Sequence, residues 1–181
     1  MTKQIPVKIS PELLRGIDDY LQRYYVQAPV QPAREVRELF SCYKRAASCA
    51  PPSAAMAMSL EEVLKQEDAG FAQTLLRLID DSGKKDSEIY KKADISKQHF
   101  SKIRNNPGYK PTKPTAIAFA LALELDLEQT KDLIGRAGYA LTNSSKFDLI
   151  IRYFIEQKNY NVVEINIALY EFDQPLLGAQ L

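Results

Sequence analysis

The apolar stretch from Thr115 to Leu125, TAIAFALALEL, restricts the fold of this chain more than any other part of the sequence. Only Thr115 and Glu124 are polar, so a helix over these residues is apolar on nearly every face. Such a helix has to be covered by other elements on all of its sides. Its uninterrupted apolar part, Ala116 to Leu123, is far too short to cross a bilayer. We therefore predict that this stretch, opened by Pro114, is the buried central helix of a soluble domain.

Helix-capping and helix-ending residues recur at short intervals on both sides of this stretch. Ser, Asp and Asn cap helix N-termini, often with Glu or Gln three residues later, and Gly commonly follows the last helical residue. The expected helices run from Phe71 to the stop at Gly83, from about Ser87 to Ala93, from Ser96 to about Asn105, from Pro114 to Leu125, from Asp126 to Gly138, from Asn143 or Ser144 to Ile155, and from Asn161 to Phe172. The fold class expected from this pattern is all-α.

The N-terminal segment, residues 1–40, combines a short candidate strand with an amphipathic helix. Residues 5–9 alternate apolar and polar side chains, as in a strand, and Ser10-Pro11 is a typical helix start. Apolar residues then recur at helical spacing on one face, at Leu13, Leu14, Ile17, Tyr20, Leu21 and Tyr24. These elements are too small to form a core alone, so they pack on the rest of the chain, on a second copy or on another protein. Residues 5–25 are therefore a candidate partner-binding or self-association surface.

Residues 41–58 have the composition of a flexible linker. The run is rich in Ala and Ser and contains Pro51 and Pro52. Ser59-x-x-Glu62 has the form of a capping box, so we expect order to resume there. The chain is thereby divided into an N-terminal segment (1–40), the linker (41–58), a helical domain (59–140) and a helical extension (141–181).

The sequence lacks the residue groups that most enzymes and metal sites require. Cys42 and Cys49 both lie in the linker, and His99 is the only histidine, so no zinc ligand set is formed. There is no Gly-rich phosphate loop and no nucleophile–base pair. We expect a protein that is not an enzyme, needs no cofactor and does not enter a membrane. Because the first residues lack the apolar segment of a secretory signal, we expect it in the cytoplasm.

Charge is unevenly distributed along the chain. The net charge of the whole sequence is +1, but the stretch from Lys84 to Lys113 contains nine Lys or Arg and three Asp or Glu, a local charge of +6. The remainder then carries a charge of −5. A basic stretch in a mildly acidic protein is typical of a surface that faces phosphates, although lysine is also common on solvated helical faces.

Within this basic stretch, residues Lys84 to Arg104 have the pattern of two short helices joined by a tight turn. Ser96 is placed to cap the second helix. The residues spaced to face the core are Ile89, Ile95, Phe100 and Ile103. The second helix then presents polar and basic side chains outward. A helix-turn-helix of this kind offers its second helix to a DNA groove.

With these residues in matching positions, Phe71 to Gly138 resembles the phage-repressor-like (Cro/Xre-type) family of DNA-binding domains. The resemblance implies a five-helix domain whose third helix, here residues 96–105, reads DNA. Over about Ser59 to Gly178, the chain is similar more specifically to a subfamily of small bacterial proteins. These add a two-helix C-terminal extension that ends in a PLLG-like tail, here Pro175 to Gly178. Membership would imply a transcriptional regulator.

The sequence departs from the family pattern at three positions. Asp86 stands where these domains commonly have a Gln that bonds a phosphate, and a carboxylate there repels the DNA backbone. Tyr90 replaces the small residue that is usual where the two helices meet. Asp94 replaces the Gly that is usual in the turn, and Asp tolerates the left-handed conformation better than most residues do. These departures leave the fold intact but weigh against the family's usual mode of operator reading.

The second helix of the pair carries side chains suited to DNA. With Ser96 as the cap, the residues expected towards solvent are Lys97, Gln98, His99, Lys102 and Arg104. Gln98 matches the N6 and N7 edge of adenine, and Lys102 reaches guanine O6 and N7. The basic residues better placed for phosphate contacts are Lys97, Arg104, Lys92 and Lys110. His99 is expected either at the surface or groove edge or with its side chain capping the first turn of the helix. Tyr109 is expected to close the turn that follows rather than to stack on a sugar.

Two functions agree with these patterns. The first is a DNA-binding transcriptional regulator, as a monomer or a homodimer, that reads double-stranded DNA with residues 96–105. The second is a protein-interaction adaptor that uses the helix-turn-helix fold as a scaffold and docks on a partner through its N-terminal helix. The basic stretch favours the first function, and the three departures favour the second.

Overall fold

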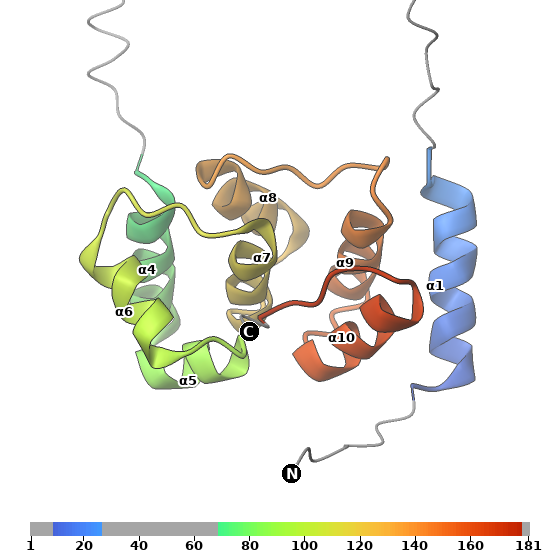
Figure 1. Cartoon of the computed structure of the whole chain (residues 1–181), viewed down its shortest axis with the longest axis horizontal. Helices are drawn as coiled ribbons and strands as arrows, with labels where there is room; N and C mark the ends of the chain where they lie inside the picture. The colour runs from blue at the N-terminus through green and yellow to red at the C-terminus, as the bar shows by residue number, and fades with distance from the viewer. Residues whose placement is uncertain (1–8, 27–68, 179–181) are drawn as a thin grey trace, which may run out of the picture. The chain divides into compact units, whose positions relative to one another are not determined.

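A computed structural model of the chain describes residues 9–26 and 69–178, which belong to one packed unit. These residues form eight α-helices and no strand, so the described part is all-α (Figure 1). The helices are α1 (Pro11–Tyr24), α4 (Phe71–Ser82), α5 (Asp86–Lys92), α6 (Lys97–Asn105), α7 (Lys113–Ala122), α8 (Leu127–Arg136), α9 (Lys146–Glu156) and α10 (Val162–Glu171). Among them, none has the length and apolar character needed to span a bilayer.

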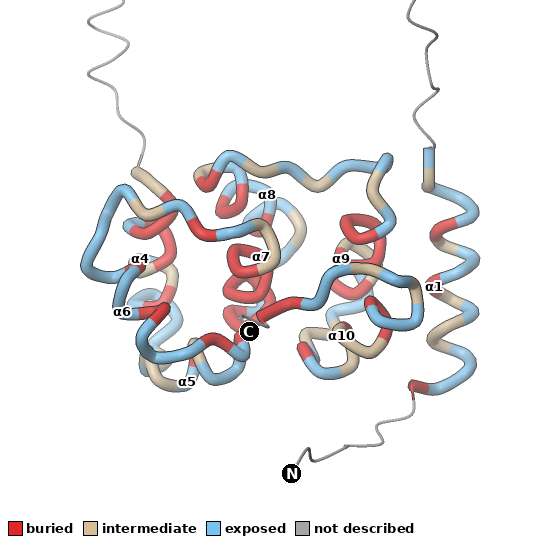
Figure 2. The backbone as a smooth tube through the Cα atoms, in the orientation of Figure 1, coloured by how far each residue is buried: buried red, intermediate tan, exposed pale blue. Residues whose placement is uncertain are grey.

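The central position of α7 confirms the prediction made from its sequence. All of its residues from Thr115 to Ala122 are buried, and Figure 2 shows this helix as an almost continuous buried segment. It contacts α5, α8 and α10, so both the basic pair of helices and the C-terminal helices pack on it. A helix that is apolar on every face is stable here because neighbours cover each side.

Four of the predicted helix starts, at Ser10, Ser96, Asp126 and Asn161, are confirmed by side-chain caps. The Ser96 hydroxyl accepts a hydrogen bond from the N–H of His99 at 3.2 Å, and Asp126 and Gln129 form a reciprocal capping box. The predicted start of α9 at Asn143 or Ser144 is wrong. The cap is Ser145, whose Oγ accepts from the N–H of Asp148 at 3.3 Å. The hydroxyl of Ser144 instead donates to Thr142 Oγ1.

Five helices end through the same reversal of the chain. In α5, α7, α8, α9 and α10, a residue with positive φ follows the helix, and its N–H and the next N–H bond back to carbonyls of the last turn. Gly138 occupies this position after α8, as predicted. After the other four helices the residue is not a glycine: it is Asp94, Glu124, Lys158 or Asp173.

The N-terminal helix α1 packs beside α9 of the same chain (Figure 1). Ile17 and Leu21 are buried there, and Tyr20 Oη donates to Glu156 Oε2 at 2.9 Å. The sequence left open whether this helix packs on the rest of the chain, on a second copy or on another protein. In the described residues it packs on the rest of the chain. The candidate strand at 5–9 lies outside the described residues except for Ile9, which is not in a strand. The linker at 41–58, its two cysteines and the capping box at Ser59 also lie outside them.

Candidate nucleic-acid interface

Helices α5 and α6 are anchored to the core by the residues that the sequence predicted. Those buried are Ile89, Ile95, Phe100 and Ile103. Tyr90, one of the three departures, packs over Phe100 with ring centroids 5.7 Å apart, and Phe100 in turn lies 6.0 Å from Phe119 of α7. The larger side chain at this position is thus accommodated by aromatic packing. The two helices and the turn between them, residues 86–105, are called the α5–α6 pair below.

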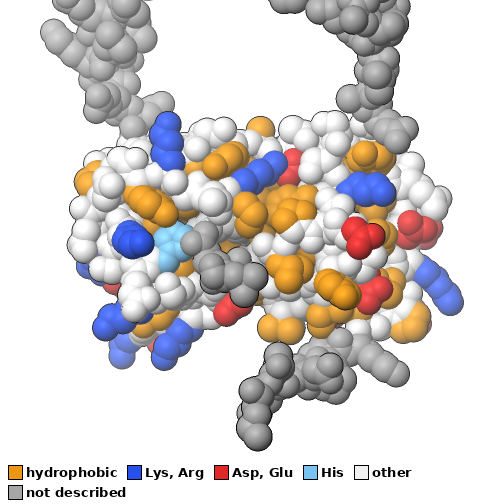
Figure 3. All heavy atoms as spheres, in the orientation of Figure 1, with side chains coloured by type: hydrophobic (Ala, Val, Ile, Leu, Met, Phe, Trp, Pro, Cys, Tyr) orange, Lys and Arg blue, Asp and Glu red, His pale blue; other side chains and the backbone are white. Residues whose placement is uncertain are grey.

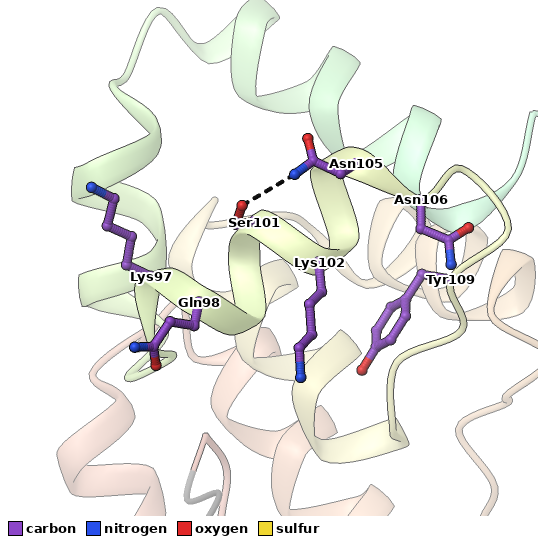
Figure 4. Close-up of a pocket in the computed structure, with 7 residues that line it drawn as sticks. All are labelled: Lys97, Gln98, Ser101, Lys102, Asn105, Asn106 and Tyr109. Carbon is purple, nitrogen blue, oxygen red and sulfur yellow. Dashed lines mark hydrogen bonds between the residues drawn. The ribbon is translucent and has the colours of Figure 1, made fainter.

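The exposed face of α6 borders a hollow of about 690 Å³ (Figure 4). The hollow is lined by Lys97, Gln98, Ser101, Lys102 and Asn105 of α6, and by Asn106 and Tyr109 of the loop that follows. The side chains of Lys102 and Tyr109 run in the same direction, whereas Asn105 turns back and donates to Ser101 Oγ at 3.3 Å. Helix α6 carries no Asp or Glu, so nothing on the helix itself repels an anion.

A second hollow, of about 550 Å³, lies between α5 and α6. Its lining residues are Lys84, Lys85, Asp86, Ser87, Tyr90, Lys97, Phe100, Ser101 and Arg104. Because Lys97 and Ser101 line both hollows, the exposed face of α6 stands between them as a ridge. A helical ridge that carries polar and basic side chains, with a hollow on each side, has the form of an element that enters the groove of a nucleic acid.

The predicted basic contacts divide into paired and unpaired cations. Arg104 is paired with Asp86, and Lys92 with Glu124. The hydrogen bond from Lys92 holds the pKa of the Glu124 carboxyl below its usual value. Within residues 9–26 and 69–178, no carboxylate forms an ion pair with the remaining three, Lys97, Lys102 and Lys110. Figure 3 shows several Lys and Arg side chains gathered around the α5–α6 pair, and apolar and acidic ones over α9 and α10.

The predicted surface position of His99 is wrong, because only 8% of this residue is exposed. Its Nε2 shares a hydrogen bond with Tyr109 Oη at 3.1 Å, beneath the loop that follows α6. Burial and, to a smaller extent, the nearby Lys102 lower the pKa of His99. The N–H of Tyr109 also donates to the carbonyl of Asn106 at 3.0 Å, so Tyr109 closes this turn as predicted. The only sequence pattern that indicated a return of the chain towards His99 was the turn-forming Pro107-Gly108, just before Tyr109.

The predicted partner-binding face of α1 is largely covered within the chain. Ile17 and Leu21 are buried, and the partly buried residues packed against the core are Leu13, Leu14 and Tyr20. Tyr24 is exposed, with the Arg152 guanidinium 5.7 Å from its ring centroid. Burial and the hydrogen bond to Glu156 raise the pKa of Tyr20 far above its usual value. This face is therefore not free in the structure.

In the residues that the structure describes, no group of three or more His, Cys, Asp or Glu is arranged to hold a metal ion. No family model matches the sequence, and no curated protein or solved structure matches it either. The functional interpretation thus depends on the geometry and charge of the described residues.

Proposed function

We propose that this protein is a DNA-binding transcriptional regulator of the repressor-like helix-turn-helix type. The five-helix domain runs from α4 to α8, and α9 and α10 form its C-terminal extension. One observation carries the proposal: the ridge of α6 presents Lys97, Gln98 and Lys102 to solvent, with no carboxylate on the helix. Two further expectations, assignment to the Cro/Xre-type family and a cytoplasmic location, belong to the same proposal.

The dimensions of α6 suit the major groove of B-DNA. Its nine residues extend over roughly 13 Å at 1.5 Å per residue, and the groove, about 12 Å wide, admits one α-helix. Gln98 is assigned to an adenine edge and Lys102 to a guanine edge, because their amide and ammonium groups match those patterns. Lys97 and Lys110 are assigned to phosphates, which position the protein without specifying sequence.

Arg104 and Lys92 have a lesser role in this proposal than the unpaired lysines. Each is balanced by a carboxylate, Asp86 and Glu124 respectively, so part of its attraction for phosphate is cancelled. His99 contacts no base in this arrangement, because it is buried beneath Tyr109. Its place is to support the loop that forms one wall of the first hollow.

The proposal is tested by replacing Lys97 and Lys102 together with Ala. For a random-sequence 30-base-pair duplex, loss of the phosphate-facing Lys97 and the base-facing Lys102 should lower affinity and reduce the slope of log K against log salt by about 0.9, the share of the one phosphate contact. The matched control replaces Lys131 and Lys158, on α8 and after α9, which removes the same charge elsewhere. An unchanged mobility-shift titration for the first variant contradicts DNA binding through α6.

A second candidate function is the protein-interaction adaptor. It is favoured by an exposed apolar row on α10, where Val163 and Tyr170 are 51% and 72% exposed, with Ile167 between them. In the adaptor originally expected from the sequence, α1 docks on the partner, and this requires α1 to leave α9. If the Lys97 and Lys102 variant binds DNA like the wild type, co-purification with the wild type and with Tyr170→Lys identifies whether α10 holds a partner.

A further inference from the structure

The short segment after α10 crosses back to the α5–α6 pair. Figure 1 shows the last described residues running from α10 to the end of α5. Leu177 in this segment is completely buried. Its backbone is held by one side chain: Asn166 Nδ2 donates to the Leu177 carbonyl at 3.1 Å, and the Leu177 N–H donates to Asn166 Oδ1 at 2.7 Å. A reciprocal pair of this kind fixes both the position and the direction of the segment.

Gly178 then lies directly against the turn between α5 and α6. A Cβ atom at this position would be 2.7 Å from the carbonyl oxygen of Ala93 and 2.9 Å from that of Asp94. The φ of Gly178 is +70°, which also disfavours any other residue. The close approach and the positive φ both require glycine at this position. Asp94, the second of the two residues contacted, is the residue at which the chain reverses after α5.

The turn that Gly178 touches determines where α6 begins. Asp94 has a φ of 55°, and the N–H of Ile95 bonds back to the carbonyl of Tyr90 at 2.8 Å. Ser96, the next residue, is the N-cap of α6. A shift of the Asp94 peptide is therefore transmitted within four residues to Lys97 and Gln98 at the start of the reading helix.

We propose that Leu177 and Gly178 form a positioning element for α6, through which the C-terminal extension sets the direction of the reading helix. This inference rests on the proposed function for its DNA consequence, but not for the contact itself. Hydrogen bonds to base edges need placement within about 0.5 Å, whereas phosphate attraction tolerates larger shifts. Disturbing Gly178 should therefore reduce sequence discrimination more than non-specific binding.

The first arm of the test measures the turn itself. In the full chain, Gly178→Ala should speed amide hydrogen exchange at Asp94 and Ile95 by about tenfold, with α9 unaffected. The matched control is Gly135→Ala in α8, where nothing lies within 4 Å of an added Cβ. Asn166→Leu serves as a second variant, since it removes both hydrogen bonds to Leu177 without touching the turn. Unchanged exchange at Asp94 and Ile95 in both variants overturns the proposal.

The second arm measures DNA. Duplexes are selected from a random library by the wild type, and affinity is compared for a selected and a scrambled duplex. Gly178→Ala should lower this ratio about fivefold while the salt slope stays the same. If amide exchange at Asp94 and Ile95 is faster but the ratio of the two affinities is unchanged, the tail only stabilises the fold. This outcome overturns the positioning role. If the wild type selects no duplex, DNA reading by α6 fails, and the exchange arm still decides whether the tail holds the turn.

Discussion

Asp86 and Arg104 form an ion pair and both line the second hollow. In the proposed function, this ion pair affects how helices α5 and α6 approach a phosphate. Asp86 is the first residue of α5, and Arg104 lies in the last turn of α6. The carboxylate repels a phosphate and at the same time neutralises a cation that would bind one. Both side chains are partly exposed, so the pair is weak and opens at small cost. In the proposed DNA-binding function, Asp86 therefore restrains binding without blocking it.

Replacing Asp86 with Asn should strengthen DNA binding, because it removes a repulsive charge and releases Arg104. We expect affinity for a random 30-base-pair duplex to rise about threefold to tenfold at ~0.1 M salt, and the salt slope to steepen by about 0.9. Fluorescence anisotropy at several salt concentrations measures both quantities. Asp19→Asn on α1 makes the same charge change elsewhere and should have little effect. Equal affinities for Asp86→Asn and the wild type would show that Arg104 does not reach the DNA.

For single residues, the sequence correctly predicted which side chains are buried where burial follows from helical periodicity. The inward positions of Ile89 and Phe100 follow from spacing alone, and the structure confirms them. His99 was misplaced because its burial comes from the folded-back loop that carries Tyr109, not from its position on the helix. The pairing of Arg104 with Asp86 was missed for a related reason: the two residues meet only after the turn brings α5 and α6 together.

At the scale of elements, most helix starts and most helix ends lie close to the predicted residues, but the geometry of the ends was not predicted. Starts depend on a local side-chain bond, such as that from the N–H of Gln129 to Asp126 at 2.8 Å, and this leaves a clear sequence pattern. Four of the five reversals at positive φ use a residue other than glycine. Such residues carry strain that the surrounding packing has to offset. The ends predicted at Ala93, Ile155 and Phe172 lie within one residue of those observed, but no sequence pattern indicated the positive φ at Glu124, Lys158 and Asp173.

The strain at one of these ends should be measurable. Lys158, exposed after α9, has a φ of 53°, and its N–H donates to the carbonyl of Ile155 at 3.0 Å. Lys158→Gly keeps this bond and relieves the strained backbone, so we expect the free energy of unfolding to rise by about 1 kcal/mol. Urea denaturation measures the change. Lys158→Ala removes the same side chain but keeps the strain, so a gain of equal size in that variant would refute the explanation.

At the scale of the whole molecule, a buried carboxylate joins segments that are distant in the sequence. Asp148 of α9 is 1% exposed, and Lys113 Nζ at the start of α7 lies 2.6 Å from its Oδ1. The N–H and hydroxyl of Thr142 donate to Oδ2 at 2.9 and 3.1 Å. This network connects the central helix, the loop before α9 and the C-terminal extension. Lys113 and Thr142 reach the Asp148 carboxylate only when all three are in place.

Removing the cation from this network should be costly. Lys113→Met leaves the Asp148 carboxylate buried without its counter-charge, and we expect a loss of about 3 kcal/mol in the free energy of unfolding. Lys131→Met on α8, which breaks an exposed pair with Glu128, should cost less than about 1 kcal/mol. Urea denaturation of both variants provides the comparison. Similar small losses in the two would show that solvent already screens Asp148.

The sequence by itself determined the all-α class of the described residues, the central helix α7, most helix starts and the inward side chains of α5 and α6. These follow from periodicity and from bonds between residues at most four positions apart. Only the tertiary structure decided that α1 packs on α9, that Asp86 balances Arg104, that His99 is buried and that Gly178 lies against the α5–α6 turn. Each of these contacts joins residues that are close only in the folded chain, and no local pattern encodes such a meeting.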